Sequence, residues 1–459
     1  MLVRRCYDDR LAQASYLIGC QETGEAIVID PSRDITPYLD AARQEGVRIT
    51  RVTETHIHAD FLSGSRELAA ATGAEIMLSA EGGEDWQYRY PATALRDGDV
   101  IMVGAVRLTV LHTPGHTPEH LAFLVTDTAR SADPVALVSG DFLFVGDVGR
   151  PDLLEEAAGV ARSKEPSARQ LFHSLQRLAA LPDYLQIWPG HGAGSACGKA
   201  LGALPTSTLG YERRTNWAFG FEDESAFVAA VLEGQPPAPT YFARMKRLNR
   251  DGPAILGARH APAKLDRSEL PRALRDGVVL DTRPWAAYAK AHLAGTLNIP
   301  LIKAFTTWAG WLLPDTRDIF LVADDSKAAA DAERALSSIG LDRLAGWFGA
   351  DVVAAAEADG TSLQSHLAPM ADAPRMQSEG ALVVDVRDGH EWNAGHLDGA
   401  VHHPLGTLAS ALADVDRTRP IAVHCEGGTR SAIAASLLKQ MGFRQVTDLS
   451  DGWSGIKRR

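Results

Sequence analysis

The sequence predicts a multi-domain α/β protein, and three observations lead to this fold class. The chain has 459 residues, too many for one ordinary hydrophobic core, so two to four domains are expected. The first half alternates β-rich runs such as EAIVID and VRLTVLHT with helical stretches at residues 63–72 and 167–180. The second half contains an internal repeat whose copies each alternate strands with helices, a pattern typical of parallel sheets.

The composition is that of a globular protein that binds neither nucleic acid nor membranes. Hydrophobic residues make up 45% and charged residues 23%, and the formal net charge is -12, whereas nucleic acid requires a basic face. No run approaches the roughly 18–20 apolar residues of a membrane span. Asp8 and Asp9 interrupt the segment where a signal peptide would be apolar. The four scattered cysteines do not form a disulfide framework, so we expect a cytoplasmic protein.

A proline-rich segment, EGQPPAP at residues 233–239, marks the end of the first domain. The run TYFARMKRLNRDGP that follows it predicts a helix that ends at Asp-Gly-Pro, since glycine and proline do not continue a helix. The first domain is therefore predicted to span residues 1–255. Within it, chemically interesting side chains follow the ends of four predicted strands, as expected when loops on a rigid sheet build a site.

Six of these side chains are histidines or aspartates that can converge on one metal ion. Mixed imidazole and carboxylate ligation suits Zn, Fe or Mn. A single loop histidine is usually solvated or hydrogen-bonded, but a compact HxHxD motif and short turns rich in Gly or Ala favour a shared metal site. The candidates are His56, His58, Asp60, His116, Asp141 and His191.

With these motifs, residues 1–255 resemble the metallo-β-lactamase superfamily, which implies an αββα sandwich with its metal site at strand ends. The family's first motif usually runs HxHxDH, and Phe61 stands here in place of the last histidine, which counts against a binuclear hydrolase. Within the superfamily the sequence is most similar to persulfide dioxygenases. That resemblance implies one Fe(II) per chain, held by His56, His116 and Asp141, with positions open for O2 and a substrate sulfur.

The same resemblance leaves three of the candidates beside the metal. His58, Asp60 and His191 either orient the ligands and bound water or ligate the metal directly. The sequence alone does not separate these two interpretations.

Two more residues of the first domain are candidates for substrate binding or an accessory role. Arg150, in DVGRPD, is expected either to hold an anionic thiol cofactor through its guanidinium or to pair with Asp152. Cys197, in HGAGSACGKALG, lies in a turn that is expected to open a helix, a position that lowers a thiol pKa. A buried, inert cysteine is the alternative.

The second half of the chain repeats one pattern. VVLDTRPWAAYAKAHLAGTLNIP at residues 278–300 parallels LVVDVRDGHEWNAGHLDGAVHHP at residues 382–404, and a hydrophobic strand follows each copy. Two small α/β domains with parallel sheets, at residues 260–360 and 372–459, are predicted. The residue pairs that recur at equal spacing are Asp281 and Asp385, Arg283 and Arg387, His292 and His396, and Pro300 and Pro404.

A cysteine loop after the second repeat predicts sulfur chemistry. Cys425 ends a hydrophobic strand, a Gly-rich loop follows, and Arg430 opens a helix. Glycines let successive N–H groups face the sulfur, and the helix N-terminus and Arg430 add positive potential. Such a loop stabilises a thiolate or a persulfide. The loop residues are Glu426, Gly427, Gly428 and Thr429.

The spacing between Cys425 and Arg430 is shorter than the CX5R cradle of cysteine phosphatases. With Asp385-Val386-Arg387 upstream and Asp451-Gly452-Trp453 downstream, residues 372–459 resemble rhodanese sulfurtransferases. The resemblance implies that the cysteine carries the transferred sulfur. The first copy, at residues 260–360, also resembles a rhodanese, but it reads VADDSKAAAD with Ala323 and Asp324 near the place of the cysteine. It is therefore expected to be inactive.

Taken together, the domains resemble fused persulfide dioxygenase–sulfurtransferases of sulfide detoxification. The resemblance implies that O2 oxidises a low-molecular-weight thiol persulfide to sulfite at the iron. Cys425 then forms thiosulfate from sulfite, or works in the reverse direction. Glutathione, coenzyme A or another low-molecular-weight thiol is compatible as the carrier. A homo-oligomer is compatible with the sequence, with the inactive domain as a contact surface.

Two other functions are compatible with the sequence. The first is a Zn-dependent thioester hydrolase similar to glyoxalase II with an accessory sulfurtransferase domain, in which metal-bound hydroxide attacks a carbonyl. The second is a non-enzymatic sulfur relay or sensor, for which replacing His116 and Asp141 would leave the function intact.

Overall fold

A computed structural model describes residues 1–156, 162–199, 201–257 and 261–457. The chain divides into two compact units, one made mainly of Met1–Arg259 and the other mainly of the residues that follow. Among the described residues, none of the helices combines the length and the apolar character needed to cross a bilayer.

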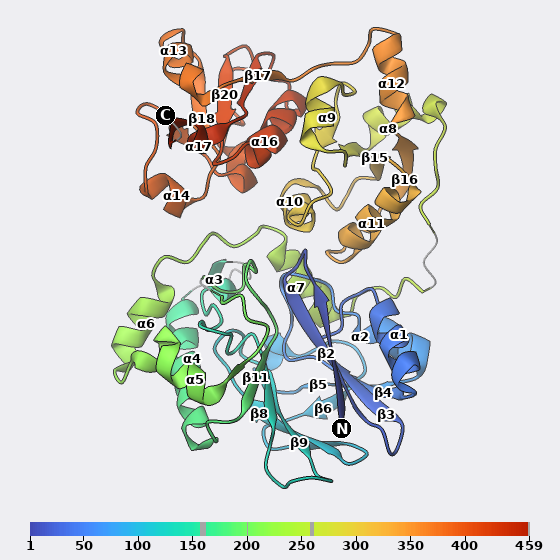
Figure 1. The fold of residues 1–459 in the computed structure, drawn as a ribbon, viewed down its shortest axis with the longest axis vertical. Coiled ribbons are helices and arrows are strands. Elements are labelled where there is room, and N and C mark those ends of the chain that lie inside the picture. The colour runs from blue at the N-terminus through green and yellow to red at the C-terminus, as the bar shows by residue number, and fades with distance from the viewer. Residues whose placement is uncertain (157–161, 200, 258–260, 458–459) are drawn as a thin grey trace. The chain divides into compact units, whose positions relative to one another are not determined.

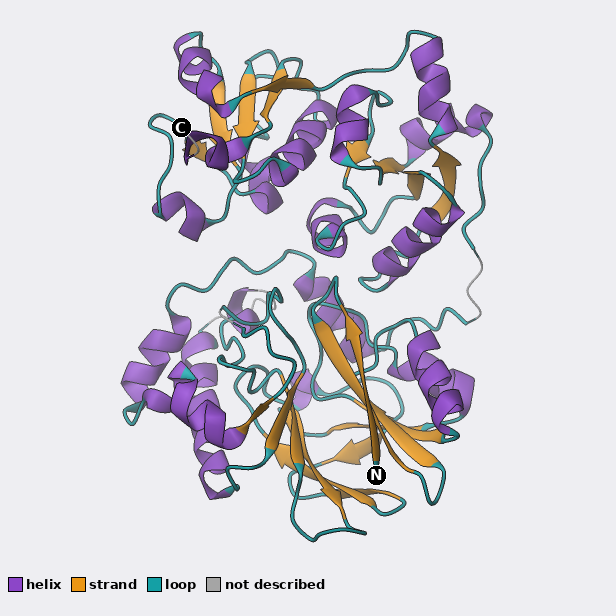
Figure 2. Cartoon of the chain, in the orientation of Figure 1, coloured by secondary structure: helices purple, strands orange, loops and turns teal. Residues whose placement is uncertain are grey.

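The first unit contains two six-stranded sheets packed face to face (Figure 2). The strands β3, β4, β5 and β6 of the first sheet run parallel, whereas the second sheet is antiparallel except for the pair β10–β11. The first sheet consists of β1 (Leu2–Asp8), β2 (Gln13–Cys20), β3 (Glu25–Ile29), β4 (Arg48–Thr53), β5 (Glu75–Ser79) and β6 (Thr93–Leu95). The second consists of β7 (Val100–Val103), β8 (Val106–His112), β9 (Leu121–Asp127), β10 (Ala136–Gly140), β11 (Gln186–Pro189) and β12 (Ser207–Thr208).

Helices cover the outer face of each sheet (Figure 1). Alternating apolar residues such as Ile18, Leu108 and Phe123 fill the space between the sheets. A second core lies between the first sheet and the helices α1 (Thr36–Glu45) and α2 (Ser65–Thr72). A third lies between the second sheet and α4 (Lys164–Arg177), α5 (Leu209–Thr215) and α6 (Glu224–Leu232). The expected αββα layering is confirmed.

The helix at the end of the first unit also forms where the sequence predicts it. It is α7 (Phe242–Asp251), and Gly252 follows it with a φ of 98°. Its buried face carries both apolar and polar residues at helical spacing, namely Phe242, Met245, Lys246 and Asn249. The prediction for residues 63–72 starts too early, because α2 begins at Ser65 while the Ser63 hydroxyl bonds to Glu54. The helix predicted over residues 167–180 begins earlier, at Lys164, and its last turn is a 3-10 turn.

The second unit contains two parallel sheets whose shared strand order confirms the internal repeat. The first has the order β14-β13-β15-β16, and the second has β19-β18-β20-β21 with β17 added at the edge. The strands of the first are β13 (Val278–Asp281), β14 (Leu297–Asn298), β15 (Ile319–Ala323) and β16 (Leu344–Gly349). Those of the second are β17 (His366–Ala368), β18 (Leu382–Asp385), β19 (Val401–His402), β20 (Ile421–His424) and β21 (Val446–Leu449).

Helices flank both of these sheets. In the first copy they are α8 (Leu270–Asp276), α9 (Trp285–Lys290), α10 (Phe305–Leu312), α11 (Ser326–Ser337) and α12 (Asp351–Ala358). In the second copy they are α13 (Ala373–Ser378), α14 (Gly389–Asn393), α15 (Leu408–Ala411), α16 (Thr429–Gln440) and α17 (Gly452–Lys457).

Candidate functional site

The six predicted metal-binding side chains follow the C-terminal ends of four strands in the first unit. Three of them lie in the loop after β4, one in the loop after β8, one directly after β10 and one after β11. All six are buried. This confirms that the residues predicted to form the site follow strand ends, and the fold brings four loops together there.

Three of these side chains converge as one donor group. The Nε2 atom of His56 lies 3.8 Å, and that of His116 lies 3.5 Å, from Oδ2 of Asp141. Two atoms that share one ion at bonds of about 2.1 Å are at most about 4.2 Å apart, so these distances fit a common metal. Both carboxylate oxygens of Asp141 and Nε2 of His56 are buried without a hydrogen-bond partner among the described residues. Buried polar atoms are rarely left unpaired in proteins, so the three side chains fit a bound cation.

A hydroxyl sets the tautomer of His56. Thr55 Oγ1 donates to Asp30 Oδ2 at 2.9 Å and lies 3.0 Å from Nδ1 of His56. A hydroxyl has a single proton, so His56 Nδ1 must carry the proton of the second hydrogen bond. The lone pair of His56 is therefore on Nε2, the atom that faces Asp141. Nothing in the sequence singles out Thr55 or Asp30 beyond their positions just after β4 and β3.

His120, which the sequence analysis did not select, holds the Asp141 backbone. The N–H of Asp141 donates to Nε2 of His120 at 3.1 Å, so the proton of this imidazole is on Nδ1, which donates to Thr113 Oγ1 at 2.8 Å. Burial lowers the pKa of His120 to about 3, so the ring stays neutral and can accept this bond. The sequence signal that could have identified His120 is its position in HTPGHTPEH, the segment that also contains His116.

His58 lies in a different group from His56. Its Nε2 atom is 3.1 Å from Asp30 Oδ1 and 3.2 Å from Glu54 Oε2. Burial alone would lower the pKa of His58, but the two carboxylates raise it well above its usual value. The ring also packs against Phe61, with 4.3 Å between the centroids. With Nε2 engaged by carboxylates, His58 supports the loop rather than presenting this nitrogen to the His56 group.

The other two predicted neighbours form a second donor group beside the first. His191 Nε2 lies 3.4 Å from Asp60 Oδ2 and 3.4 Å from Asp141 Oδ2. His191 Nδ1 donates to the carbonyl of Ala12 at 3.2 Å, which leaves Nε2 with its lone pair. The Sγ atom of Cys197 lies within 4.8 Å of ligand atoms of Asp60 and His191. Asp141 therefore lies between the two groups.

The surroundings of Cys197 favour the buried, inert cysteine over the reactive one, and the expected helix after it is wrong for the described residues. The described residues of the turn around it form no helix, so the thiol has no helix N-terminus to stabilise a thiolate. Cys197 is 1% exposed, and burial, together with the carboxylates of Asp60 and Asp141, raises its pKa.

The structure favours the ion-pair interpretation of Arg150. Its guanidinium is fully buried and donates to both carboxylate oxygens of Asp152, at 3.1 and 2.6 Å. It also donates to the carbonyls of Ala196, at 3.1 Å, and Pro236, at 2.7 Å. Arg150 thus ties three loops together near the site, and its donors are engaged within the protein.

The cysteine loop of the second unit brings the N–H of Gly428 to the sulfur of Cys425. Cys425 follows β20, is 1% exposed, and its Sγ atom accepts a hydrogen bond from the Gly428 N–H at 3.2 Å. The thiol also lies 3.7 Å from the Ser431 hydroxyl on α16. Gly428 has a φ of 97°, and a Cβ atom there would lie 2.3 Å from the carbonyl oxygen of Ser450, so only glycine fits this position. Gly427 and Thr429 complete the turn into α16.

The charged side chains of this loop are bound in ion pairs. Arg430 donates to both oxygens of Glu391 at 2.6 and 2.7 Å and to Asp388 at 3.2 Å. Glu426 accepts from Ser454 at 3.1 Å and from Arg387 at 3.4 Å. Arg430 is therefore held beside the cysteine loop by Glu391 and Asp388.

The two copies share an aspartate–arginine pair with the same hydrogen bonds. Arg387 Nε lies 3.0 Å from both oxygens of Asp385, and Arg283 Nε lies 3.0 and 3.1 Å from those of Asp281. Each arginine also donates from its backbone N–H to the same aspartate at 3.0 Å. The two copies thus share these hydrogen bonds as well as the sequence motif.

The first copy has an alanine where the second has its thiol. Asp385 is paired with His424 across β18 and β20, and Asp281 is paired with Val322 across β13 and β15. The residue after each partner is Cys425 in one copy and Ala323 in the other. Without a sulfur atom at this position, covalent sulfur carriage cannot occur in the first copy.

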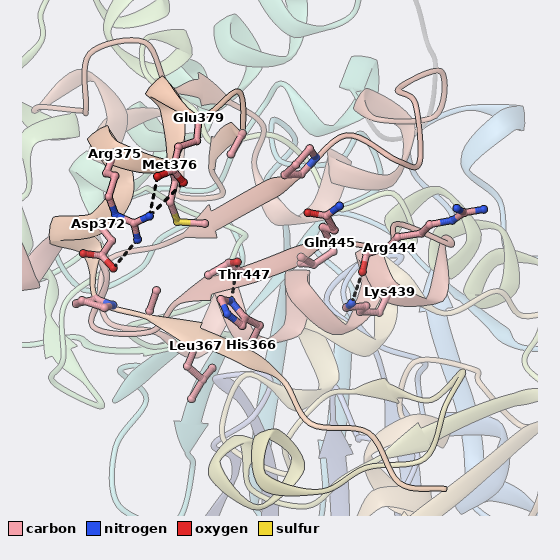
Figure 3. A pocket seen from close by; sticks show the side chains of 15 residues that line it. His366, Leu367, Asp372, Arg375, Met376, Glu379, Lys439, Arg444, Gln445 and Thr447 are labelled. Carbon is pink, nitrogen blue, oxygen red and sulfur yellow. Dashed lines mark hydrogen bonds and ion pairs between the residues drawn. The ribbon is translucent and has the colours of Figure 1, made fainter.

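A surface cavity of about 730 Å³ opens on the second unit, away from the cysteine loop. Its lining includes Ala381, Pro420 and Gln445, which precede the parallel strands β18, β20 and β21, whereas Cys425 follows β20. Figure 3 shows that Arg375 in this cavity is already paired with Asp372 and Glu379. The cavity therefore lies at the N-terminal ends of these parallel strands, and the thiol lies at their C-terminal ends.

Comparisons with known proteins agree with this architecture. A model of the metallo-beta-lactamase superfamily matches residues 8–191, and a model of the rhodanese-like domain matches residues 369–459. A solved metallo-beta-lactamase from Staphylococcus aureus is 43% identical, with a TM-score of 0.68, and the match covers 76% of this chain and 99% of that one.

Several curated relatives carry the name hydroxyacylglutathione hydrolase. The protein of Maricaulis maris is 32% identical over 272 residues, which is 57% of this chain and 92% of the relative. The protein of Rhodospirillum rubrum is 36% identical over 178 residues, and this chain spans 60% of its length. With two sheets layered between helices, buried histidines and aspartates at strand ends, and a cysteine loop in the second unit, the chain belongs to the metallo-β-lactamase superfamily and carries a C-terminal rhodanese-like domain.

Proposed function

We propose that the protein oxidises a low-molecular-weight thiol persulfide with O2 and passes sulfane sulfur through Cys425. The first reaction converts RSSH, O2 and water into RSH and sulfurous acid, so that the outer sulfur is oxidised and O2 is reduced. The thiol leaves with a proton, and sulfite is the second product. The proposal places the reaction in sulfide detoxification.

The observation that carries the proposal is a donor group of three side chains. His56, His116 and Asp141 converge, while His58 is engaged by two carboxylates and Phe61 stands where a further histidine would be. Two imidazoles and one carboxylate are the donor set of non-haem Fe(II) oxygenases. One Fe(II) per chain, bound there, supplies a centre at which O2 and a sulfur anion meet.

The remaining residues of the site orient these donors. Thr55 and Asp30 hold the His56 tautomer, and His120 holds the backbone of Asp141. Such outer partners keep ligands deprotonated and fixed in direction. The burial of the whole group excludes bulk water, which protects an oxidation-sensitive sulfur intermediate.

In the rhodanese-like domain, the proposed step is transfer of sulfane sulfur to sulfite. The Cys425 persulfide and sulfite give the Cys425 thiolate and thiosulfate, with one S–S bond broken and one S–S bond formed. The Gly428 N–H is placed to hold the negative sulfur. The reverse reaction, from thiosulfate, uses the same groups.

The test is anaerobic purification, elemental analysis and oxygen-electrode assays with several persulfides. We expect one iron per chain and O2 uptake that depends on persulfide, with sulfite formed in equal amount. A folded, metal-loaded protein that contains only zinc and consumes no O2 with any persulfide would contradict the proposal.

A second candidate is thioester hydrolysis at zinc, and two observations favour it. The relatives named above are called hydroxyacylglutathione hydrolases, and the Asp60 and His191 group lies next to Asp141 as a second donor set. Metal-bound hydroxide would attack the thioester carbonyl. Thiol release from a hydroxyacyl thioester under anaerobic conditions distinguishes this reaction, because persulfide oxidation requires O2.

A further inference from the structure

The helix α7 packs its buried face on the loop that carries His56 and His58. The side-chain amide of Asn249 donates to the carbonyls of His58 and Phe61 at 2.8 and 2.7 Å, and its oxygen accepts from the Ser63 N–H at 2.9 Å. Three hydrogen bonds from one side chain fix this helix face against the metal-binding loop.

Lys246 lies on the same face, one turn before Asn249. The residue is 6% exposed, and its Nζ atom is buried with no hydrogen-bond partner in the described parts of the chain. The ammonium lies 4.9 Å from the centroid of the Trp86 ring, a cation–π contact that does not satisfy its N–H donors. A buried ammonium without hydrogen-bond acceptors is costly, and its N–H donors would be satisfied by an anionic ligand.

The Trp86 ring that Lys246 contacts lies beside Glu119, because a Cβ atom added at Gly82 would lie 2.8 Å from the Glu119 nitrogen and 3.0 Å from the Trp86 Cβ. Burial lowers the pKa of His116, and the positive charge of Lys246 lowers it further. Burial lowers the pKa of Lys246 to about 8, and the nearby carboxylate of Glu119 partly offsets this effect. Glu119 accepts from the Ile57 N–H at 2.8 Å through Oε1, so it is held on the metal-binding loop.

We propose that Lys246 binds an anionic group of the substrate or product beside the His56, His116 and Asp141 donors. This inference rests on the proposed function, because it names the substrate class of the same site. The anion has two possible sources: a carboxylate on the thiol carrier, or the sulfur oxyanion that the oxidation produces. An ammonium is a compact charge with three donors, which suits either group.

The experiment measures binding to the full-length, metal-loaded protein by anaerobic calorimetry. Three small thiols of similar size differ in charge: 3-mercaptopropionate, 2-mercaptoethanol and cysteamine. Sulfite is the fourth probe. The variants are Lys246→Met, which removes the charge, Lys246→Arg, which keeps it, and Arg247→Met, which removes a neighbouring exposed charge.

In the native protein we expect 3-mercaptopropionate to bind more tightly than 2-mercaptoethanol, and cysteamine to bind least. If the carrier carboxylate is the partner, Lys246→Met weakens 3-mercaptopropionate by about tenfold or more, the effect of losing a charged hydrogen bond, and leaves 2-mercaptoethanol unchanged. If the oxyanion is the partner, the same variant weakens sulfite instead. Lys246→Arg retains the preference in either case, and Arg247→Met binds as the native protein does.

Two results would overturn the inference. One is a Lys246→Met protein that binds 3-mercaptopropionate and sulfite with native affinity. The other is equal weakening of all four probes together with a lower Tm, which would assign Lys246 a structural role. Because no probe is oxidised in these measurements, failure of O2 uptake with persulfides would contradict the proposed function without deciding the role of Lys246.

Discussion

The hydroxyl of Thr55 lies between the carboxylate of Asp30 and the imidazole of His56, at 2.9 and 3.0 Å. It accepts the Nδ1 proton of His56 because its own proton is given to Asp30. One hydroxyl thus connects a buried carboxylate to a candidate metal ligand and leaves the Nε2 lone pair of His56 facing Asp141.

Thr55→Val is expected to weaken metal binding, because Val keeps the shape but loses the acceptor for Nδ1. Loss of such an outer partner typically costs about 10–100-fold in metal affinity, measurable by competition with a chelator. Thr53→Val is the matched control, because Thr53 Oγ1 is buried without a hydrogen-bond partner among the described residues. Equal affinity in the two variants would refute the role of Thr55.

Cys425→Ala and His116→Ala are expected to have opposite effects. Cys425→Ala abolishes sulfur transfer between thiosulfate and an acceptor but spares persulfide-dependent O2 uptake, because the thiol is outside the donor group. His116→Ala lowers the iron content and abolishes O2 uptake while sulfur transfer continues. Loss of both activities in either folded variant would show that the two sites are not independent.

Gly428→Ala is expected to impair the cysteine loop, whereas Gly427→Ala is tolerated. A side chain at Gly428 meets the Ser450 carbonyl and requires a positive φ, but a Cβ at Gly427 meets nothing within 4 Å. The strain costs about 1–3 kcal/mol, and displacing the Gly428 N–H from the sulfur slows transfer by roughly tenfold or more. Sulfurtransferase rates and the Tm of both variants test this, and equal rates would count against it.

Asp448→Asn is expected to stabilise the second unit at neutral pH. Burial raises the pKa of Asp448 to about 6, above its value of about 3.9 in an unfolded chain. Between these values the unfolded state loses its proton first, so stability falls as pH rises from about 4 to about 6. The variant lacks this penalty, which is at most about 3 kcal/mol. The Tm difference between variant and native protein should be largest above pH 7 and vanish near pH 4; a pH-independent difference would contradict the assignment.

The sequence predicted the features that local patterns encode. His56, His116 and Asp141 could be identified because they follow predicted strands, and the loop around Cys425 because of its Gly-rich turn. In the structure the first three side chains lie together, and the Gly428 N–H donates to the Cys425 sulfur. Their roles in chemistry stay predictions. The fold class is confirmed. It could be predicted because hydrophobic periodicity and the repeated motifs can be read from short segments of the sequence.

The features that the sequence did not reveal depend on contacts between distant segments. In the sequence, Lys246 is one of several basic residues in a polar helix. Only the packing of α7 against the first unit shows that it is buried. Arg150 left two interpretations open until Asp152 and the Ala196 carbonyl were seen beside it. Cys197 left a reactive and an inert interpretation open, because a Gly-rich turn does not determine whether a helix follows.

The Asn249 bonds to the loop after β4 have a consequence for how the protein is made. They join residues separated by 191 positions in the chain, and contacts of such long range form late, since a large loop must close first. During synthesis, the ribosome releases the segment around His58 well before Asn249. The loop after β4 therefore reaches its final hydrogen bonding only after the whole first unit has been translated, so the candidate metal site is incomplete until then.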